Sequence, residues 1–400
     1  MLPLRGTRIL AFEQYGAGPF GTQYLADLGA EVIKVEQAKS DGDYARALGP
    51  YFVDGENRHS ASSLFFQTFN GNKKSITLDF TTDAGREVLN RLVKTADATA
   101  DNLRGDVPAK LGITYDTLGR INPRIVCAHC SAYGRTGSRA HWPGYDYLMQ
   151  AEAGYFQICG EPDAAPTRFG LSIVDYMGGM SMALGLVSAV LGARSTGKGR
   201  DVDVNLFDTA VYNLTYLASW SLNSDYEPGR NKRSAHPSMV PCQLYKTRDG
   251  WIYLMCNKES FWPGLCHAMG ASELAENERY QTFADRLKHR DELTEVIDGY
   301  LSTRTTAEWQ KLFEGKIPAT AVLSPREAME NPFVQERDGI QTRTDQTGAE
   351  FTVLRPPIDT GDTPRDDTAA PQLGEHTDDL LREIGYTTDD IEALRKNGTV

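Results

Sequence analysis

The sequence has few cysteines, no evident leader and no long apolar run. Its six cysteines are scattered over 400 residues, which is typical of reduced thiols and not of a disulfide framework. The first six residues lack the basic and apolar regions of a signal peptide. We see no apolar run of the length that crosses a bilayer. We therefore expect a cytoplasmic protein that does not act at a membrane.

Basic residues are fewer than acidic ones. The chain has 42 Lys and Arg against 54 Asp and Glu, a net charge of -12, which argues against nucleic acid as the main partner. Local basic patches for an anionic small molecule remain compatible with this charge. The hydrophobic content of 40% is ordinary for a globular protein, and the length allows two or three domains.

A complete metal motif is also missing. Cys127-Ala128-His129-Cys130 has the spacing of half a zinc site, but no second pair follows at a suitable distance. Residues 124–128 have the pattern of a buried strand, so we expect Cys127 in the core and no metal site.

Strand and helix patterns alternate at both ends of the chain. Residues 8–12 predict a strand, 16–21 a glycine loop, 22–28 a short helix and 30–35 a second strand, which together form a βαβ unit. Further predicted elements are a helix over 83–94, strands over 125–128 and 200–206, a helix over 207–222, a hairpin over 243–256, extended chain over 338–358, and helices that begin near 377 and 388. This order favours an α/β fold with parallel strands.

The polar, turn-rich stretch over residues 223–238 marks a domain boundary. We expect a large α/β, Rossmann-like domain over 1–225, a smaller α+β domain over 226–325, and a linker with a C-terminal return to the large domain over 326–400.

Two glycine-containing motifs suggest a nucleotide-binding site. Gly16-Ala17-Gly18-Pro19-Phe20-Gly21 fits G-x-G-x-x-G, with Glu36 about twenty residues further on. Pro19 removes a backbone N–H from the loop that would cradle a pyrophosphate, so NAD binding stays a minor alternative. The near P-loop over residues 192–199 lacks a hydroxyl for magnesium and precedes a strand, so we discard it.

A lone acid, Asp175, lies between two apolar patterns. Residues 180, 183, 184, 187, 190 and 191 repeat at helical spacing after it, which places Asp175 near a helix N-terminus. The helix dipole there would favour the ionised carboxylate. Gly178 and Gly179 leave room for a large group to approach. From position alone, two interpretations stay open: a helix cap or a functional acid. Upstream, Asp146 and Gln150 would share one helix face, where they could line a site or cap a helix.

Several blocks together resemble one family over almost the whole chain. They are Gly16-Ala17-Gly18-Pro19 followed by residues 25–36; Asn70-Gly71-Asn72-Lys73-Lys74-Ser75-Ile76 with Leu78-Asp79; Asp175-Tyr176-Met177-Gly178-Gly179-Met180; Thr196-Gly197-Lys198-Gly199-Arg200; and Leu373-Gly374-Glu375-His376-Thr377-Asp378. In this order the chain is similar to the class III coenzyme A transferases, which include formyl-CoA transferase and carnitine CoA-transferase and are related to the α-methylacyl-CoA racemases.

The resemblance implies that Asp175 is the nucleophile. The acid would attack an acyl-CoA thioester to give a mixed anhydride and then an aspartyl-CoA thioester, and a carboxylic acid would reverse the exchange. Backbone N–H groups at Gly178 and Gly179 could stabilise the oxyanion. No permanently bound cofactor is implied, because the coenzyme A thioester is itself the substrate.

Position 145 separates transferase from racemase. Racemases of this family carry a histidine where the chain has Tyr145, and a phenol of pKa about 10 is a poor base for an α-proton. Transfer is therefore favoured. A racemase or isomerase in which His141 takes that role remains an alternative, as does a non-catalytic CoA-binding subunit of a hetero-oligomer, against which the intact Asp175 counts.

The family pattern also implies residues that contact CoA and the substrate acid. For CoA they are Gly16, Ala17, Gln37, Leu78, Asp79, Asn102, Leu103, Lys110 and Tyr145. For the acids they are Gln14, Tyr145, Gly178, Gly179 and His236. Gln37 replaces an arginine of formyl-CoA transferase, so Lys39 could supply the charge, and Gly16 replaces its active-site glutamine, which suggests a different acyl group with Gln14 as a substitute.

The segment over residues 230–238 lies where relatives have a loop that covers the active site. It could be a lid whose Arg230, Arg233 and His236 bind a dicarboxylate such as succinate, or a solvated basic linker. Trp142 and Trp262 fit a core role better than a pocket wall. Family members form interlocked homodimers, so we expect one here, with acyl-CoA and a carboxylic acid as small-molecule partners.

Overall fold

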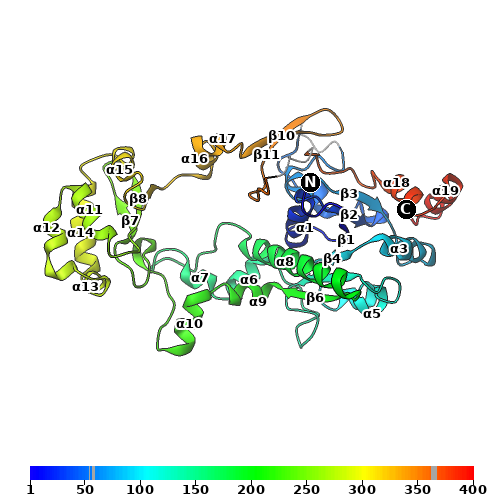
Figure 1. Cartoon of the computed structure of the whole chain (residues 1–400), viewed down its shortest axis with the longest axis horizontal. Coiled ribbons are helices and arrows are strands. Elements are labelled where there is room, and N and C mark those ends of the chain that lie inside the picture. Colours follow the sequence, from blue (N-terminus) through cyan, green and yellow to red (C-terminus); the bar gives the residue numbers. More distant parts are fainter. Residues whose placement is uncertain (54, 56–58, 362–366) are drawn as a thin grey trace. The chain divides into compact units, whose positions relative to one another are not determined.

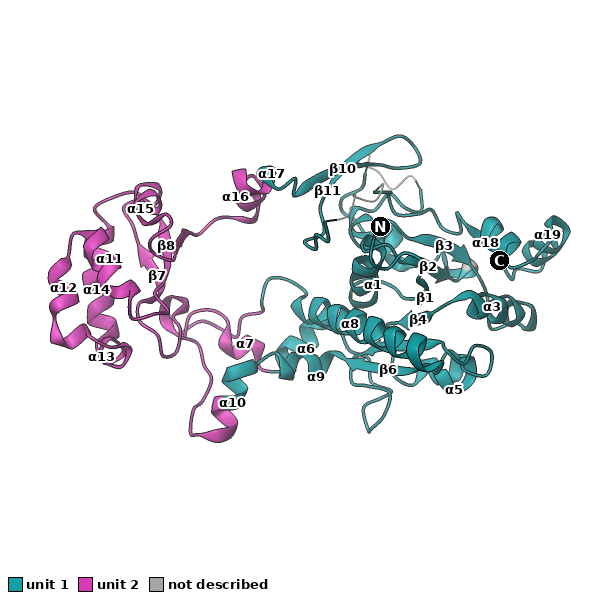
Figure 2. Ribbon diagram, viewed as in Figure 1, with its two compact units in different colours: residues 1–153, 169–219, 335–400 teal, residues 154–168, 220–334 magenta. Residues whose placement is uncertain are grey.

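The computed structural model describes residues 1–53, 55, 59–361 and 367–400, which form two compact units (Figures 1 and 2). Unit 1 comprises residues 1–153, 169–219 and 335–400, and unit 2 comprises 154–168 and 220–334. The sequence placed residues 154–168 in the large domain. They belong to unit 2, where Arg230 donates hydrogen bonds to the backbone carbonyls of Glu161, Ala164 and Ala165.

A six-stranded parallel sheet forms the centre of unit 1. Its strands are β1 (Arg8–Phe12), β2 (Glu31–Glu36), β3 (Lys74–Thr77), β4 (Ala98–Asp101), β5 (Val126–Ser131) and β6 (Arg200–Asn205). Their order is β3-β2-β1-β4-β5-β6, and every neighbouring pair is parallel. This is the doubly wound order, in which strands are added on one side of β1 up to β3 and then on its other side from β4 onwards, so that a topological switch point lies between β1 and β4. The predicted parallel α/β fold is confirmed.

Helices and a separate hairpin surround this sheet. They are α1 (Ala17–Asp27), η1 (Ala38–Ser40), η2 (Tyr44–Ala47), α2 (Leu64–Asn70), α3 (Asp83–Thr95), α4 (Val107–Leu111), α5 (Tyr115–Leu118), α6 (Asp146–Glu152), α8 (Ile173–Thr196), α9 (Leu206–Tyr212), β10 (Ile340–Thr344), β11 (Glu350–Leu354), α18 (Thr377–Glu383) and α19 (Thr388–Lys396). Helices α10 (Thr215–Asn223) and α17 (Pro332–Glu336) span the boundaries between the units. The predicted helix over 207–222 is therefore two helices.

Alternate residues of the strands form the core on one face of the sheet. Leu10 and Phe12 of β1 pack there with Val88 of α3, Leu380 of α18 and Leu394 of α19, all buried. The C-terminal helices are thus part of the core that begins with β1. Helices α1 and α8 contribute nothing to this core and pack together on β2, β4, β5 and β6.

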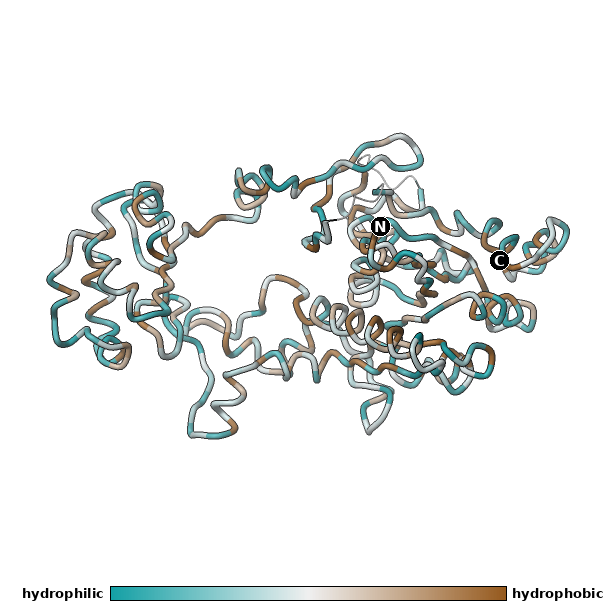
Figure 3. Tube along the Cα trace, viewed as in Figure 1, coloured by the Kyte–Doolittle hydropathy of each residue, from teal (hydrophilic) through white to brown (hydrophobic). Residues whose placement is uncertain are grey.

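Helix α8 is unusually apolar. Among the described residues it is the one helix that is long and apolar enough to cross a membrane by length and composition alone, so the expectation of no such run was wrong. Its tube is mostly white to brown in Figure 3. Helix α8 packs against α1, α9, β5 and β6. This packing accounts for the apolar residues on the buried face of α8.

Unit 2 has its own sheet and core. Its antiparallel sheet has the order β7 (Cys242–Lys246), β8 (Trp251–Met255) and β9 (Ala319–Ala321). Its helices are α7 (Tyr155–Ile158), η3 (Lys232–Ser234), α11 (Phe261–Met269), α12 (Ser272–Glu276), η4 (Glu278–Tyr280), α13 (Phe283–Lys288), α14 (Arg290–Leu301), α15 (Thr306–Phe313) and α16 (Pro325–Met329). Trp262, Trp309 and Tyr245 are buried in its core, so the core role predicted for Trp262 is confirmed.

Candidate active site

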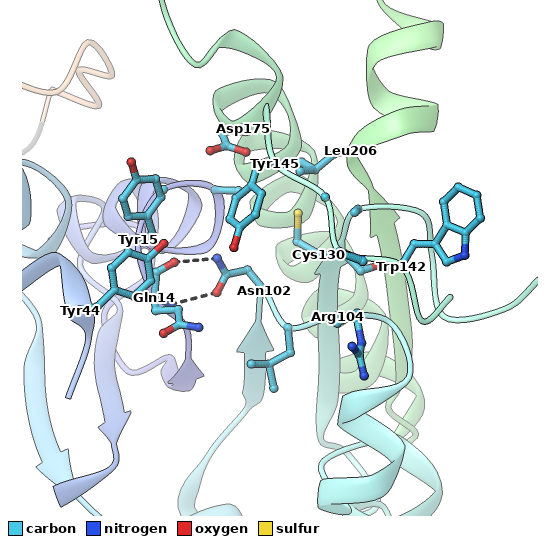
Figure 4. Close-up of a pocket in the computed structure, with 17 residues that line it drawn as sticks. Gln14, Tyr15, Tyr44, Asn102, Arg104, Cys130, Trp142, Tyr145, Asp175 and Leu206 are labelled. Carbon is cyan, nitrogen blue, oxygen red and sulfur yellow. Dashed lines mark hydrogen bonds between the residues drawn. The ribbon is translucent and has the colours of Figure 1, made fainter. Parts of the chain in front are cut away.

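A pocket of about 220 Å³ opens at the carboxyl ends of the parallel strands (Figure 4). Its walls come from the segments that follow β1 and β4, which are residues 14–17 and 102–104, together with the end of β5 and the chain that leads into α6. Asp175 of α8 also lines it. Doubly wound proteins bind ligands at this switch point, because the connections on either side of it diverge and leave a crevice.

Asp175 is a buried carboxylate in the wall of this pocket. It is the third residue of α8, and its residue exposure is only 9%. Burial, together with the nearby Asp146 carboxylate, raises its pKa to about 7. The sequence predicted that the helix N-terminus would favour the ionised form, and the structure reverses the direction of that shift. The loss of hydration outweighs the helix dipole.

The helix cap predicted at this point is Asp146, not Asp175. The Oδ2 atom of Asp146 accepts hydrogen bonds from the backbone N–H groups of Val174 at 2.7 Å and of Asp175 at 3.0 Å. Gln150 donates to the other oxygen of Asp146 at 2.6 Å, so these two residues do share a helix face. Because a neighbouring carboxylate already caps α8, the Asp175 carboxylate is left to face the pocket.

The three glycines of the G-x-G-x-x-G motif each allow a close approach within unit 1. A Cβ atom on Gly16 would lie 2.7 Å from Oδ2 of Asp175. One on Gly18 would lie 3.0 Å from the Asn102 side chain, and one on Gly21 would lie 2.3 Å from the carbonyl oxygen of Gly179. Helix α1 begins at Ala17, so the predicted loop over 16–21 was wrong. The glycines serve helix packing and the pocket wall, not a pyrophosphate.

Glu36, the acid of the dinucleotide fingerprint, is already paired within the protein. Glu36 is 4% exposed, and its two oxygens accept hydrogen bonds from Arg46 at 2.8 and 2.6 Å. A ribose hydroxyl could not reach a carboxylate that is buried and paired in this way. The NAD alternative is therefore wrong for this chain. The near P-loop lies at the end of α8, where Gly197 is the C-cap.

Six of the predicted contact residues line the pocket with Asp175. They are Gln14, Gly16, Ala17, Asn102, Leu103 and Tyr145. Tyr145 is 64% exposed and directly precedes α6. His141 is exposed and is not among the described residues that line the pocket. The racemase alternative therefore lacks a histidine beside Asp175.

Four predicted CoA contacts lie elsewhere. Leu78 is 1% exposed and belongs to the core, so its side chain cannot touch a ligand. Asp79 accepts hydrogen bonds from Lys39 at 2.9 Å and from Thr81, and these hold its pKa below the usual range. Gln37 is exposed at the end of β2. Lys110 forms an exposed ion pair with Asp106 at 2.5 Å. None of the four lines this pocket.

Gly178 and Gly179 do not provide an oxyanion hole. They are the sixth and seventh residues of α8, beyond the first four N–H groups that a helix leaves free. A Cβ on Gly178 would lie 2.5 Å from Leu206, and Gly179 contacts Ala17 and Gly21 of α1. The predicted catalytic role is wrong because both N–H groups are used within the helix and both residues serve packing.

The pocket also contains residues that the sequence did not assign to it. Tyr15 and Tyr44 stack with ring centroids 5.0 Å apart, and both line the pocket with Arg104, Cys130 and Trp142. Trp142 is 45% exposed, and its ring turns away from Asp175 in Figure 4, so its predicted core role is wrong. Burial, with the Asp175 charge, raises the pKa of the Cys130 thiol, which keeps it neutral.

Arg104 is the only cationic residue that lines the pocket within the described ranges. It pairs with Asp106 through two hydrogen bonds of 2.6 and 3.1 Å. Its position three residues after the end of β4 was the signal available in the sequence, because charged residues that follow central parallel strands lie at the binding edge. Lys110 shares Asp106 with Arg104.

The basic segment over 230–238 belongs to unit 2 and is bound within it. Arg233 pairs with Asp298 at 2.7 Å, while Arg230 binds the carbonyl groups described above. The ring nitrogen of His236 accepts hydrogen bonds from the N–H groups of Ser238 and Met239. His236 is not among the residues that line the pocket of unit 1.

The cysteine and histidine motif is structural. Cys127 is fully buried, as predicted, and His129 bridges Asp101 at 2.6 Å and Asp201 at 3.1 Å. Burial lowers the pKa of His129, but these two hydrogen bonds outweigh burial and raise it to about 9. Among the described residues, no group of three or more His, Cys, Asp and Glu side chains could hold a metal ion.

The fold and the site define an α/β enzyme with a carboxylate in a pocket at the switch point of the sheet. The model of CoA-transferase family III matches residues 4–377, and the chain belongs to that family. It is an acyl-CoA:carboxylate CoA-transferase. The predicted family and enzyme class are confirmed.

Named relatives and a solved structure agree with this assignment. The chain is 32% identical to succinate–glutarate CoA-transferase of Agrobacterium fabrum over 96% of each chain. It is 33% identical to acetyl-CoA:oxalate CoA-transferase of Acetobacter aceti, again over 96% of each. It is also similar to a CaiB/BaiF family protein from Brucella suis, with a TM-score of 0.80, 31% identity and coverage of 96% of this chain and 99% of that one.

Proposed function

We propose that the protein moves CoA from a dicarboxylic acyl-CoA, with succinyl-CoA the first candidate, to a second carboxylic acid through covalent intermediates on Asp175. The observation that carries this proposal is a buried carboxylate in the pocket wall whose pKa is about 7. Near neutral pH a large part of it is ionised, and it is poorly solvated, so it is more nucleophilic than a hydrated aspartate.

The exchange has two covalent stages. The Asp175 carboxylate attacks the thioester carbonyl, and the C–S bond breaks to give a mixed anhydride and CoA thiolate. The thiolate then attacks the Asp175 carbonyl, which releases the first acid and leaves an aspartyl-CoA thioester. The incoming carboxylate runs the same steps in reverse, so no net proton or electron is required.

The character of the pocket supports this chemistry. Tyr15, Tyr44 and Leu206 give it partly apolar walls, which would limit hydrolysis of an anhydride or thioester. Arg104 is the residue best suited to an anionic group of CoA, because a guanidinium binds phosphate oxygens in pairs. A phosphate there would compete with Asp106 for the same donors.

Two relatives suggest the acids. The name of the Agrobacterium enzyme cites succinate and glutarate, and the name of the Acetobacter enzyme cites oxalate together with acetyl-CoA. Tyr15, Tyr145 and Gln14 offer neutral hydrogen bonds to a second carboxylate in the pocket. Dicarboxylates are therefore our first candidates for the acceptor, and succinyl-CoA is our first candidate for the donor with acetyl-CoA the second.

We also propose that the protein is a homodimer. Apolar side chains on α8 recur at heptad spacing and are exposed in the single chain: Met180 is 53%, Leu184 is 71% and Leu191 is 63% exposed. A second copy would cover this face, as the interlocked assembly expected from the family would require. Light scattering combined with size exclusion would test this, and a monomer would contradict it.

Trapping tests the mechanism. The protein is incubated with succinyl-CoA and then with hydroxylamine or borohydride, and its peptides are mapped by mass spectrometry. We expect a hydroxamate or a reduced side chain at Asp175 alone, and none in Asp175→Asn. Unmodified Asp175 together with rapid α-proton exchange would instead indicate a racemase. A screen of succinyl-, acetyl- and formyl-CoA against a panel of carboxylates would identify the acids.

A further inference from the structure

The turn between β1 and α1 forms a part of the pocket wall that lies against Asp175. Gly16 leaves no room for a side chain there, because its Cβ would be 2.7 Å from Oδ2 of Asp175. The preceding Tyr15 has a φ angle of 66°, in the left-handed region that costs a non-glycine residue about 1 kcal/mol or more. The turn therefore does not adopt this shape by its own preference. Contacts from elsewhere have to hold it.

Asn102, which directly follows β4, provides one of these contacts. Its Oδ1 atom accepts a hydrogen bond from the N–H of Gln14 at 2.9 Å, and its Nδ2 atom donates one to the carbonyl of Gln14 at 2.7 Å (Figure 4). Both polar groups of the amide are thus used on the backbone of a single residue. Gly18 makes room for the Asn102 side chain, since a Cβ there would lie 3.0 Å from it.

Asp43 holds the same turn from the other side. Both of its oxygens accept hydrogen bonds from the N–H of Tyr15, at 3.2 and 3.3 Å. Lys34 pairs with Asp43 at 2.8 Å and donates to the carbonyl of Glu13 at 2.9 Å. Both side chains of this pair are completely buried, so removing either charge would leave the other unpaired and endanger folding. Asn102 is partly exposed, so the fold can lose it at less cost.

We propose that Asn102 is a positioning residue for the Asp175 chemistry and not a contact for CoA. By fixing Gln14 it fixes Gly16, and with it the space in which the Asp175 carboxylate meets the substrate carbonyl. This inference rests on the proposed function. It differs from the CoA-binding role that the family pattern implied for Asn102, because both hydrogen bonds that the amide makes in the structure go to the backbone of Gln14.

The test compares Asn102→Ala with Asn122→Ala. Asn122 is a matched control at the opposite end of the sheet: its Nδ2 atom donates to the carbonyls of Val93 and Ala96, and its Oδ1 atom accepts from the N–H of Arg124. Asn102→Ala should lower kcat roughly 10- to 100-fold, the cost of a displacement of about 1 Å near the reacting atoms. CoA affinity, measured by calorimetry, should stay unchanged. Asn122→Ala should lower the melting temperature and leave kcat unchanged.

Hydrogen–deuterium exchange gives a readout that does not depend on activity. Exchange in the peptide that covers residues 14–17 should be faster in Asn102→Ala and unaltered in Asn122→Ala. If Asn102→Ala folds poorly, Asn102→Asp serves in its place: it keeps the shape and the acceptor but loses the donor to Gln14, and it should also speed exchange there.

Three outcomes would overturn the inference. They are weakened CoA binding with kcat unchanged, which would make Asn102 a ligand contact; an unchanged kcat together with unchanged CoA binding; and unaltered exchange over residues 14–17 in both Asn102 variants. Failure of the proposed function looks different. The wild-type protein would then show no trapped intermediate at Asp175, while the exchange comparison would still decide whether Asn102 holds the turn.

Discussion

The two ends of the parallel sheet use charged residues in different ways. At the amino end, Arg8 and Lys74 pair with Glu31, and all three side chains remain partly exposed. At the carboxyl end, Lys34 and Asp43 pair with no exposure at all. Exposed pairs contribute little to stability, whereas a buried pair is expensive to break. The carboxyl end thus holds its loops rigidly, and the pocket is built on those loops.

The largest effect should come from Asp175→Asn at the carboxyl end. If Asp175 is the nucleophile, CoA transfer should fall on the order of 10⁴-fold, while CoA affinity should change little. A coupled assay for free and acylated CoA measures the first quantity, and calorimetry measures the second. Residual transfer within tenfold of wild type would contradict the covalent mechanism.

Asp175→Asn should also change how the stability of the protein depends on pH. The pKa of Asp175 is about 7 in the folded protein against an ordinary 3.8, so the folded state holds this proton more tightly than the unfolded state. The free energy of unfolding of the wild-type protein therefore falls as pH rises from 3.8 to 7, because Asp175 has to ionise in its buried site. The stability of Asp175→Asn relative to wild type should increase over that window and level off above it, as urea unfolding would show. A difference independent of pH would contradict the raised pKa.

Gly16→Ala should have the next largest effect. Its new Cβ would meet the Asp175 carboxylate at 2.7 Å, and a forced shift of the turn or the carboxylate should cost about 10²-fold in kcat. Gly192→Ala is the control from the last turns of α8, because a Cβ there meets nothing within 4 Å and alanine favours a helix. It should keep full activity and melt at the same or a higher temperature. Equal effects of the two substitutions would contradict the proposed pocket wall.

His129→Gln should show whether His129 carries a positive charge near the carboxyl end of the parallel sheet. The folded pKa of about 9 lies above the ordinary 6.5, so the hydrogen bonds to Asp101 and Asp201 stabilise the fold fully below pH 6.5, and this contribution is lost as pH rises through 9. Unfolding in urea should show a wide gap between wild type and variant below pH 6.5 and a narrower one above pH 9. The gap for Asn122→Ala should not change with pH. A constant gap for His129→Gln would mean that His129 is neutral.

Features that neighbouring residues define could be predicted from the sequence, whereas features that depend on contacts between distant segments could not. Strand β1 and helices α18 and α19 followed from local periodicity and caps, since their patterns are complete within a few residues. Asp175 was found through resemblance, because its position alone could not separate a catalyst from a cap. Asp146 could not be recognised as the true cap, since the hydrogen bonds that define it cross from α6 to α8.

The glycine motif led to a wrong prediction, whereas the Asp146 cap led to none. Its spacing predicted a nucleotide loop because the same residues are needed wherever backbone must approach closely. Only the structure shows that Gly21 faces Gly179 and that Gly18 faces Asn102. Tyr44 and Cys130 were missed for a related reason: Tyr44 lies in no recognisable motif, and Cys130, near the end of β5, drew attention only as part of half a zinc site.

The smallest effect should come from Glu383→Gln at the amino end. Glu383 pairs with Arg8 at 2.5 Å and is 46% exposed, while Arg8 keeps its bond to Glu31. Such a pair contributes about 0.5 kcal/mol, so the melting temperature should fall by about 1 °C, and added salt should reduce the difference. Kinetic constants should match wild type, because the charge lies at the end of the sheet opposite the pocket. A substantial loss of activity in this variant would show that the two ends are coupled and that rigidity at the carboxyl end depends on surface pairs at the amino end.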